Sequence, residues 1–142
     1  MGQLRLPDAG LVYLDANCLI YSVEHIEPYD LLLQQVWHRG GVMTSELSLL
    51  EVLVKPFKAK DRLLQASYRE LLKAPEVKRL MPLTAEVLEQ AARLRAEVNI
   101  KTPDAIHAAS ALIGQATLFL SNDERFKRVP GLPFQYLNAV AI

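Results

Sequence analysis

The sequence predicts an α/β fold built around a mostly parallel sheet. Short apolar runs of strand length alternate along the chain with longer segments whose apolar residues recur at helical spacing. That alternation is typical of parallel strands joined by crossover helices. Apolar residues make up 51% of the 142 residues, enough to bury both faces of such a sheet. The length fits one domain, which we expect to span residues 1–142.

The first half of the chain alternates between strand and helix. The predicted elements are a strand over 11–14, helices over 17–25 and 28–40, a strand over 42–44 and a helix that begins at Ser48. Pro28 suits the first turn of its helix, and the pair Gly40-Gly41 is a suitable end. Pro56 lacks the N–H that a helix interior requires, so we expect it to end or kink the helix from Ser48.

The second half continues the same alternation. The predicted elements are a peripheral helix over 60–73, a strand within 77–83, helices that begin at 84 and 102, a strand over 117–120 and a weaker strand over 134–137. Thr84 can cap its helix, which carries an apolar stripe. Thr102 is a second candidate N-cap, with Pro103 at the first helical position. The helix from Thr102 is apolar on nearly every side, which indicates burial.

Four acidic residues lie in or beside strongly apolar runs: Asp15, Glu51, Asp104 and Asp123. A carboxylate in such a place is costly unless it is paired, hydrogen-bonded or bound to a metal. Asp15 directly follows the first strand and Asp123 follows the fourth, while Asp104 opens a helix that leads back into a strand. Ligands bind at the carboxyl ends of parallel strands. The topology therefore places these three acids at one edge of the sheet.

Each of these three acids also has a purely structural explanation. Asp15 precedes a helix and can cap it. Asp104 lies in a first turn, where a negative charge favours the helix dipole. Asp123 belongs to a Ser-Asn-Asp-Glu segment, which can be simply a turn with a cap. For a single residue the two explanations are equally good, but independent caps have no reason to converge on one edge.

Glu51 has a structural alternative of a different kind. Ser48 and Glu51 form the S-x-x-E pattern of a capping box, which needs no catalytic role. Leucine and valine flank Glu51 on both sides, so we expect its face of the helix to be buried. Glu46 is the competing acid nearby, and its place in a predicted loop favours exposure to solvent.

Clustered carboxylates repel one another, so a cation is expected among them. All-oxygen ligand sets favour Mg²⁺ or Mn²⁺. A zinc site is not expected, because Cys18 is the single cysteine and His25, His38 and His107 lack ligand spacing. His107 is better explained as a satisfied core residue or a neighbour of the ligands. Metal ions held by acids can activate a water and stabilise the leaving oxygen of a phosphodiester.

Charge and composition narrow the functional classes. The chain has 16 basic and 16 acidic residues, so it cannot hold nucleic acid by bulk charge. Arg125, Lys127 and Arg128 follow Asp123 and could contact phosphate, although a solvated basic turn explains them as well. The single cysteine fits a reducing compartment. The N-terminus has no signal-peptide pattern and no apolar run is long enough to span a membrane, so we expect a cytoplasmic protein.

Taken together, the acidic motifs resemble those of the PIN domain family, and within it the VapC-type toxins of bacterial and archaeal toxin–antitoxin pairs. The resemblance covers most of the chain in the right order. Its segments are V-Y-L-D-A-N over 12–17, T-S-E-L-S-L-L-E-V-L over 44–53, T-P-D-A-I-H-A-A over 102–109 and F-L-S-N-D-E-R-F over 119–126. The third segment is the most specific of the four.

The resemblance implies a three-layer α/β/α fold and a Mg²⁺- or Mn²⁺-dependent ribonuclease that acts as a toxin. It implies that the acidic quartet, which serves as both metal ligands and catalytic groups, is Asp15, Glu51, Asp104 and Asp123. It also implies that Asn17 and Ser121 orient the acids, with Glu51 favoured over Glu46. The implied partners are RNA, a small antitoxin protein and a second copy in a homodimer. The alternative is a PIN-like module that binds or processes RNA with weak or no nuclease activity.

Overall fold

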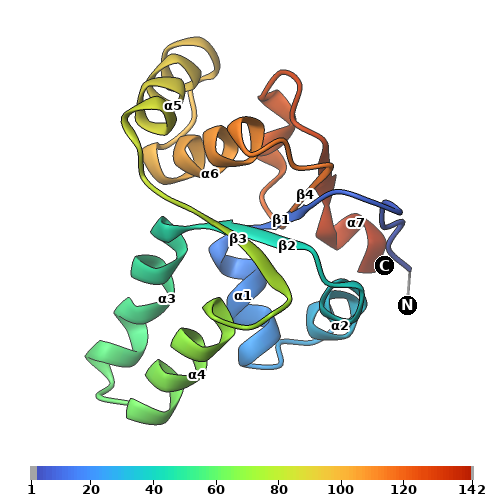
Figure 1. Ribbon diagram of the computed structural model, residues 1–142, viewed down its shortest axis with the longest axis vertical. Coiled ribbons are helices and arrows are strands. Elements are labelled where there is room, and N and C mark those ends of the chain that lie inside the picture. The colour runs from blue at the N-terminus through green and yellow to red at the C-terminus, as the bar shows by residue number, and fades with distance from the viewer. Residues whose placement is uncertain (1–2, 142) are drawn as a thin grey trace.

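The computed structural model describes residues 3–141 and contains one five-stranded sheet, all of whose neighbouring strands are parallel (Figure 1). The strand order is β3-β2-β1-β4-β5. The strands are β1 (Val12–Leu14), β2 (Val42–Ser45), β3 (Val77–Met81), β4 (Leu118–Ser121) and β5 (Phe134–Tyr136). The predicted α/β class with a mostly parallel sheet is therefore confirmed.

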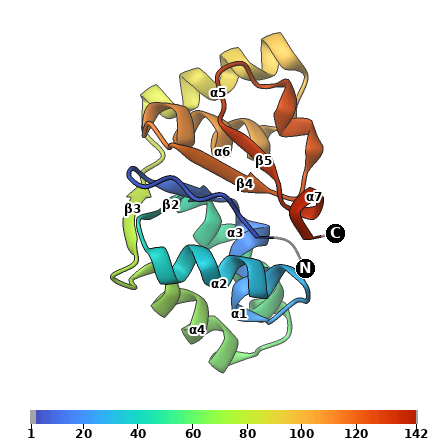
Figure 2. The ribbon, with the colours of Figure 1, turned by 90° about the vertical axis from the view of Figure 1, so that its right-hand side faces the viewer.

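Helices cover both faces of this sheet and make three layers, as the resemblance implied. Figure 2 shows α5 and α6 on one face and α1 to α4 on the other. The helices are α1 (Ala16–Val23), α2 (Tyr29–Arg39), α3 (Glu46–Lys58), α4 (Arg62–Leu72), α5 (Ala85–Val98), α6 (Thr102–Ile113) and α7 (Leu137–Ala141), with a 3₁₀ helix η1 (Glu124–Arg128). Over residues 3–141, no helix is both long and apolar enough to cross a membrane.

Side chains of the central strands alternate between two cores. In β1, Leu14 packs with the α1–α4 side, whereas Tyr13 packs with the α5–α6 side. In β4, Leu120 and Phe119 divide in the same way. All four side chains are fully buried, because helices cover the sheet on both faces. This burial explains why these strands read as continuous apolar runs in the sequence.

The start of α3 differs from the prediction. The helix begins at Glu46, and its N-cap is Ser45, whose hydroxyl accepts from the Leu47 N–H at 3.0 Å. Strand β2 runs directly into α3 without a loop, so the first free N–H groups meet Ser45 rather than Ser48. The buried Ser48 hydroxyl is hydrogen-bonded to that of Thr44 at 2.7 Å instead. The predicted capping box between Ser48 and Glu51 was wrong, and Glu51 lies inside the helix.

Three other helix boundaries also shifted. Pro28 is the N-cap of α2 rather than a residue of its first turn. Pro56 does not end α3, which continues to Lys58. Lys101, not Thr102, is the N-cap of α6. The hydroxyl of Thr102 accepts from the Arg95 guanidinium at 2.9 Å, and Thr102 is the first residue of the helix.

The centre of the α5–α6 core provides a test of the fold. Phe119 is fully buried and stacks on Tyr13, with ring centroids 4.9 Å apart; it also packs against the tilted ring of Phe126, at a centroid distance of 4.7 Å. Phe119→Ala leaves a cavity that the surrounding side chains cannot fill, and should lower the free energy of unfolding by about 3–5 kcal/mol in a urea titration. Leu63→Ala, at a side chain that is 83% exposed, should change it by less than about 0.5 kcal/mol. Similar losses in both variants would contradict this packing.

Candidate functional site

Three of the four predicted acids surround one cavity at the carboxyl edge of the sheet. Asp15 directly follows β1, Glu51 lies in the helix after β2, and Asp104 lies in the first turn of α6, which leads into β4. The cavity has a volume of about 190 Å³, and its lining residues are Asp15, Ala16, Asn17, Ile20, Glu51, Asp104 and His107. Residues distant in the sequence thus form a single acidic site.

Asp15 is both a helix cap and a wall of this cavity. Its Oδ1 accepts from the Cys18 N–H at 3.1 Å, which makes it the N-cap of α1. Only 6% of the residue is exposed. Burial raises the pKa of Asp15 above its ordinary value, while His107 and the Ser121 hydroxyl act in the opposite direction. The capping role predicted as an alternative is therefore real, and it coexists with a place in the acidic site.

Glu51 is held by a chain of two hydrogen bonds that begins in the core at Tyr13. Its Oε1 lies 2.6 Å from Nε2 of His107, and Nδ1 of His107 lies 2.6 Å from the hydroxyl of Tyr13. An ionised carboxylate only accepts hydrogen bonds, so Nε2 donates to Glu51. The other ring nitrogen, Nδ1, is then the atom that pairs with the hydroxyl of Tyr13. Burial, with the charges of Asp15 and Glu51, raises the pKa of Tyr13, which keeps its hydroxyl a donor.

Asp123 lies outside the cavity and is paired with Arg125. Its Oδ2 is 2.6 Å from Nη2 of Arg125, and its Oδ1 is 2.9 Å from Nε. These hydrogen bonds lower the pKa of Asp123. Nη2 of Arg125 is also 3.9 Å from Oδ2 of Asp104. Burial raises the pKa of Asp104, the charge of Asp123 adds to the rise, and Arg125 opposes it.

The two polar residues predicted beside the acids lie close to them. Asn17 is exposed on α1 and lines the cavity. Ser121 is fully buried at the end of β4, where its hydroxyl accepts from the Asp123 N–H at 3.0 Å. Glu46, in contrast, lies away from the cavity and accepts from the Leu83 N–H at 3.1 Å. Of these two acids, Glu51 therefore lines the cavity and Glu46 does not.

Sequence reasoning missed Tyr13 as a member of the site. In the sequence Tyr13 is one apolar residue in a short strand, and nothing in the pattern shows that its hydroxyl reaches across to α6. His107 gave a partial signal, because it is a polar residue in an otherwise apolar helix. The structure places it at 3% exposure between Tyr13 and Glu51, so it belongs to the wall of the cavity.

The carboxylate oxygens of the site suit a hard divalent cation, but the acidic side chains lie too far apart in this structure to coordinate one ion together. Carboxylate oxygens are the ligands that Mg²⁺ and Mn²⁺ prefer. Over residues 3–141, however, no three His, Cys, Asp or Glu side chains are close enough together to hold a metal ion. Two of the acids are turned to protein partners, Glu51 to His107 and Asp123 to Arg125.

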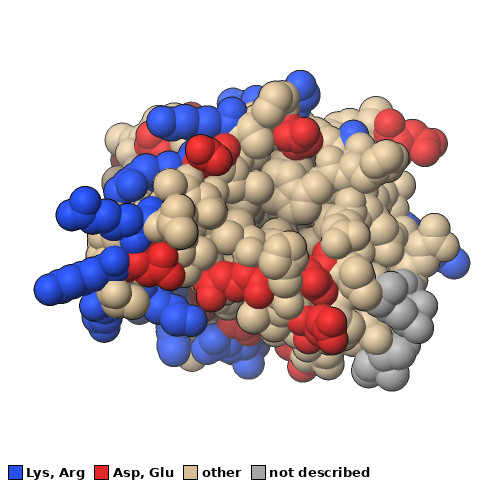
Figure 3. Space-filling model, turned by 90° about the horizontal axis from the view of Figure 1, so that it is seen from below, with Lys and Arg blue, Asp and Glu red and all other residues tan. Residues whose placement is uncertain are grey.

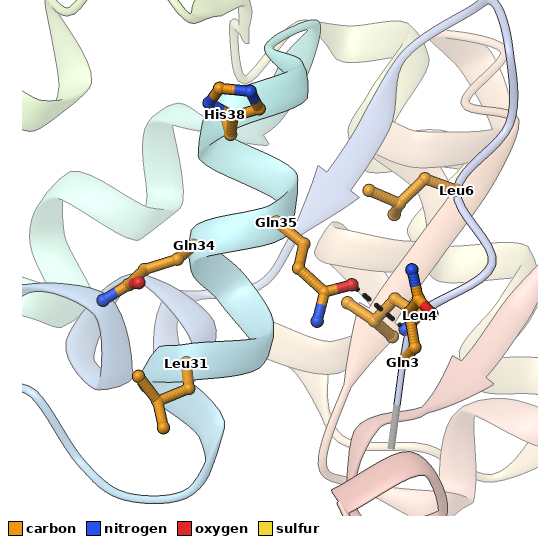
Figure 4. Close-up of a pocket in the computed structure, with 7 residues that line it drawn as sticks. All are labelled: Gln3, Leu4, Leu6, Leu31, Gln34, Gln35 and His38. Carbon is orange, nitrogen blue, oxygen red and sulfur yellow. Dashed lines mark hydrogen bonds between the residues drawn. The ribbon is translucent and has the colours of Figure 1, made fainter. Parts of the chain in front are cut away.

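A larger hollow lies elsewhere, between the N-terminal segment and α2 (Figure 4). Its volume is about 980 Å³, and its lining residues are Gln3, Leu4, Leu6, Leu31, Gln34, Gln35 and His38. The side-chain oxygen of Gln35 already accepts a hydrogen bond from the Leu4 N–H, at 3.2 Å. No carboxylate or cysteine lines this hollow, and size alone supplies no chemistry. The smaller acidic cavity is therefore the candidate functional site.

Comparison with known proteins agrees with the fold. The family model of the PIN domain matches residues 12–132. VapBC2 from Rickettsia felis, solved bound to a promoter DNA fragment, is 21% identical with a TM-score of 0.71 and covers 88% of this chain and 97% of its own. A toxin–antitoxin complex from Klebsiella pneumoniae is 22% identical with a TM-score of 0.69, and the match covers 85% of this chain and 94% of the Klebsiella chain. PAE2754 from Pyrobaculum aerophilum is 17% identical with a TM-score of 0.64, and the match covers 92% of this chain and 87% of PAE2754. No curated protein matches the chain in sequence.

The raised pKa of Asp15 predicts a stability effect that depends on pH. Ionised Asp15 costs stability that is absent below its ordinary pKa of 3.8, grows as pH rises towards the higher folded-state pKa, and is complete above it. Asparagine carries no charge and can still cap α1. In the presence of chelator, Asp15→Asn should therefore melt higher than wild type at pH 7, and this advantage should vanish towards pH 3. Thermal melts at both pH values provide the measurement. A variant that melts lower than wild type at pH 7 would make Asp15 chiefly a structural cap.

Proposed function

The chain belongs to the PIN domain family, and from this membership we propose that it is a metal-dependent endoribonuclease that acts as the toxin of a toxin–antitoxin pair. The observation that carries the proposal is the cavity where Asp15, Glu51 and Asp104 meet at the carboxyl edge of the sheet. Burying carboxylates together is unfavourable unless a cation is bound there. RNA is the substrate, and the cytoplasm is the expected place of action.

The acids have separate roles in this proposal. Asp15 and Asp104 are the ligands expected to hold Mg²⁺ or Mn²⁺, while Glu51 lines the same cavity and Asp123 lies at its rim, beside Arg125. A bound divalent ion supplies a water of lowered pKa and stabilises charge on the phosphate. Capping fixes the orientation of Asp15, because its Oδ1 is held by the Cys18 N–H. Asn17 and Ser121 help to orient the acids.

His107 and Tyr13 position Glu51. The two 2.6 Å hydrogen bonds of this chain run from the buried core to the carboxylate at the cavity wall. A carboxylate held on one oxygen keeps the other available to the cavity. Glu51 could then accept a proton from the attacking water as a general base, which requires hydrogen-bond reach to that water.

Contact with RNA phosphates must come from local groups, because the formal net charge of the chain is zero. Lys127 and Arg128 are exposed on η1, beside the site. The end of α3, the start of α4 and the turn between them carry a second group of exposed cations: Lys55, Lys58, Lys60 and Arg62. Figure 3 shows Lys and Arg gathered on the side of the molecule where α3 and α4 meet. Both groups are candidates for neutralising a bound RNA strand.

A small antitoxin and a second copy of the chain are the proposed protein partners. Solved structures with the same fold include a toxin–antitoxin complex from Klebsiella pneumoniae. In this chain α3 carries an apolar groove, lined by residues that include Leu50, 62% exposed, and Phe57, 52% exposed. Large exposed apolar side chains gathered in one groove are a common sign of a protein interface.

The first prediction concerns catalysis. Cleavage of single-stranded RNA should require Mg²⁺ or Mn²⁺, and Asp104→Asn should slow it by at least about a hundredfold, the loss that accompanies removal of a group stabilising transition-state charge. Glu46→Gln is the matched control and should cleave as wild type does, because Glu46 lies outside the cavity. Single-turnover cleavage of a labelled oligonucleotide gives both rates. Cleavage at full rate in excess EDTA would contradict the metal mechanism.

The second prediction concerns the toxin role. Expression of the wild-type chain in a bacterial host should arrest growth, whereas expression of Asp104→Asn at the same level should not. If a small protein encoded by a neighbouring gene is the antitoxin, its coexpression should restore growth of cells that carry the wild-type chain. Unimpaired growth with a folded chain that cleaves RNA in vitro would favour an RNA-processing role.

A further inference from the structure

Arg125 differs from the other basic residues beside the site because its guanidinium contacts two of the acids. Its guanidinium contacts both oxygens of Asp123, with Nε 2.9 Å from Oδ1 and Nη2 2.6 Å from Oδ2. The same Nη2 lies 3.9 Å from Oδ2 of Asp104. One cation thus bridges two of the four acids. Lys127 and Arg128, on the same short helix, form no such pairs with acids in residues 3–141.

We propose that Arg125 takes the place of a second divalent cation, so that the site holds one metal ion, on the side of Asp15 and Asp104. This inference rests on the proposed function, because it assumes that the acids bind a divalent ion. It assigns Arg125 a positioning role: the guanidinium holds Asp123 at the rim and neutralises it there.

The hydrogen bonds of Asp123 support this assignment. Its Oδ1 also accepts from the backbone N–H of Arg125 at 2.9 Å, and Nε reaches Oδ2 at 3.1 Å. Both carboxylate oxygens are therefore engaged by the same residue. A bidentate arginine–carboxylate pair is among the stronger hydrogen-bonded pairs in proteins. A second metal ion that used Asp123 would have to displace Arg125 from at least one of these oxygens.

Packing of η1 holds Arg125 in this place. The side chain of Phe126 is buried and packs against Phe119, at a centroid distance of 4.7 Å, and against Phe134, at 6.1 Å. Phe126 anchors the short helix on the α5–α6 core, and its neighbour Arg125 is left at the rim with a side chain 45% exposed. The acids of the cavity, in contrast, have no arginine or lysine within ion-pair distance other than Arg125 among residues 3–141.

The lining of the cavity also separates Asp123 from the other three acids. Asp15, Glu51 and Asp104 line it, whereas Asp123 does not. Asp104 stands at the boundary, because it lines the cavity and also faces Arg125. One divalent ion on the cavity side would then contact Asp15 and Asp104, whereas Asp123 on the rim side is already paired with the guanidinium of Arg125.

Counting bound Mn²⁺ tests the proposal independently of catalysis. Free Mn²⁺ gives a sharp electron paramagnetic resonance signal that is lost on binding, so a titration yields the number of ions per chain. Wild type should bind one ion, and Arg125→Gln should bind two, because the variant frees Asp123 and removes the positive charge beside it. Arg128→Gln is the matched control, with one cation lost from the same helix, and should bind one.

A double variant makes the test specific to the Arg125–Asp123 pair. Asp123→Asn alone should still bind one ion, and Arg125→Gln combined with Asp123→Asn should return from two ions to one. Two ions in wild type, or a single ion in Arg125→Gln, would overturn the role of Arg125 and leave metal binding intact. Absence of Mn²⁺ binding in every variant would overturn both this inference and the metal dependence of the proposed function.

Discussion

The arrangement of the site follows from one constraint: an ionised carboxylate loses solvation free energy when it is buried at the edge of a sheet that helices cover on both faces. Asp15 is almost fully buried and Asp104 is partly buried, and burial raises the pKa of both. Each acid is therefore tied to a partner that lowers this cost. Asp15 accepts from the first turn of α1, Glu51 is bonded to His107, and Asp123 is paired with Arg125. The partners decide which oxygens remain available to a metal.

One cluster of aromatic side chains connects the core to the residues that hold Glu51 and to the helix that carries the partner of Asp123. The hydroxyl of Tyr13 is bonded to His107, which holds Glu51. The ring of Tyr13 stacks on Phe119, and Phe119 packs on Phe126 of η1, the helix that presents Arg125 to Asp123. Glu51 and Asp123 lie on different elements, yet the same buried rings position the partners of both. The geometry of the acids is in this sense a property of the α5–α6 core.

Much of the fold and part of the site could be predicted from the sequence, for identifiable reasons. Continuous apolar runs reveal strands buried on both faces, so the α/β class and the edge that carries Asp15 and Asp104 followed from pattern and topology. Helix starts were less predictable, because β2 enters α3 without a loop and Ser45, not Ser48, meets the free N–H groups. The hydroxyl of Tyr13 and the pairing of Asp123 with Arg125 depend on side-chain directions, which no periodicity encodes.

The central claim is that the cavity between Asp15, Glu51 and Asp104 binds a divalent ion. Anomalous diffraction from crystals of the protein grown with Mn²⁺ tests this claim most directly, because the anomalous signal locates the ion among named side chains. We expect a peak in contact with carboxylate oxygens of Asp15 and Asp104, and no such peak in crystals of Asp15→Asn. A cavity without a peak in wild type, in crystals that bind Mn²⁺ elsewhere, would contradict the account.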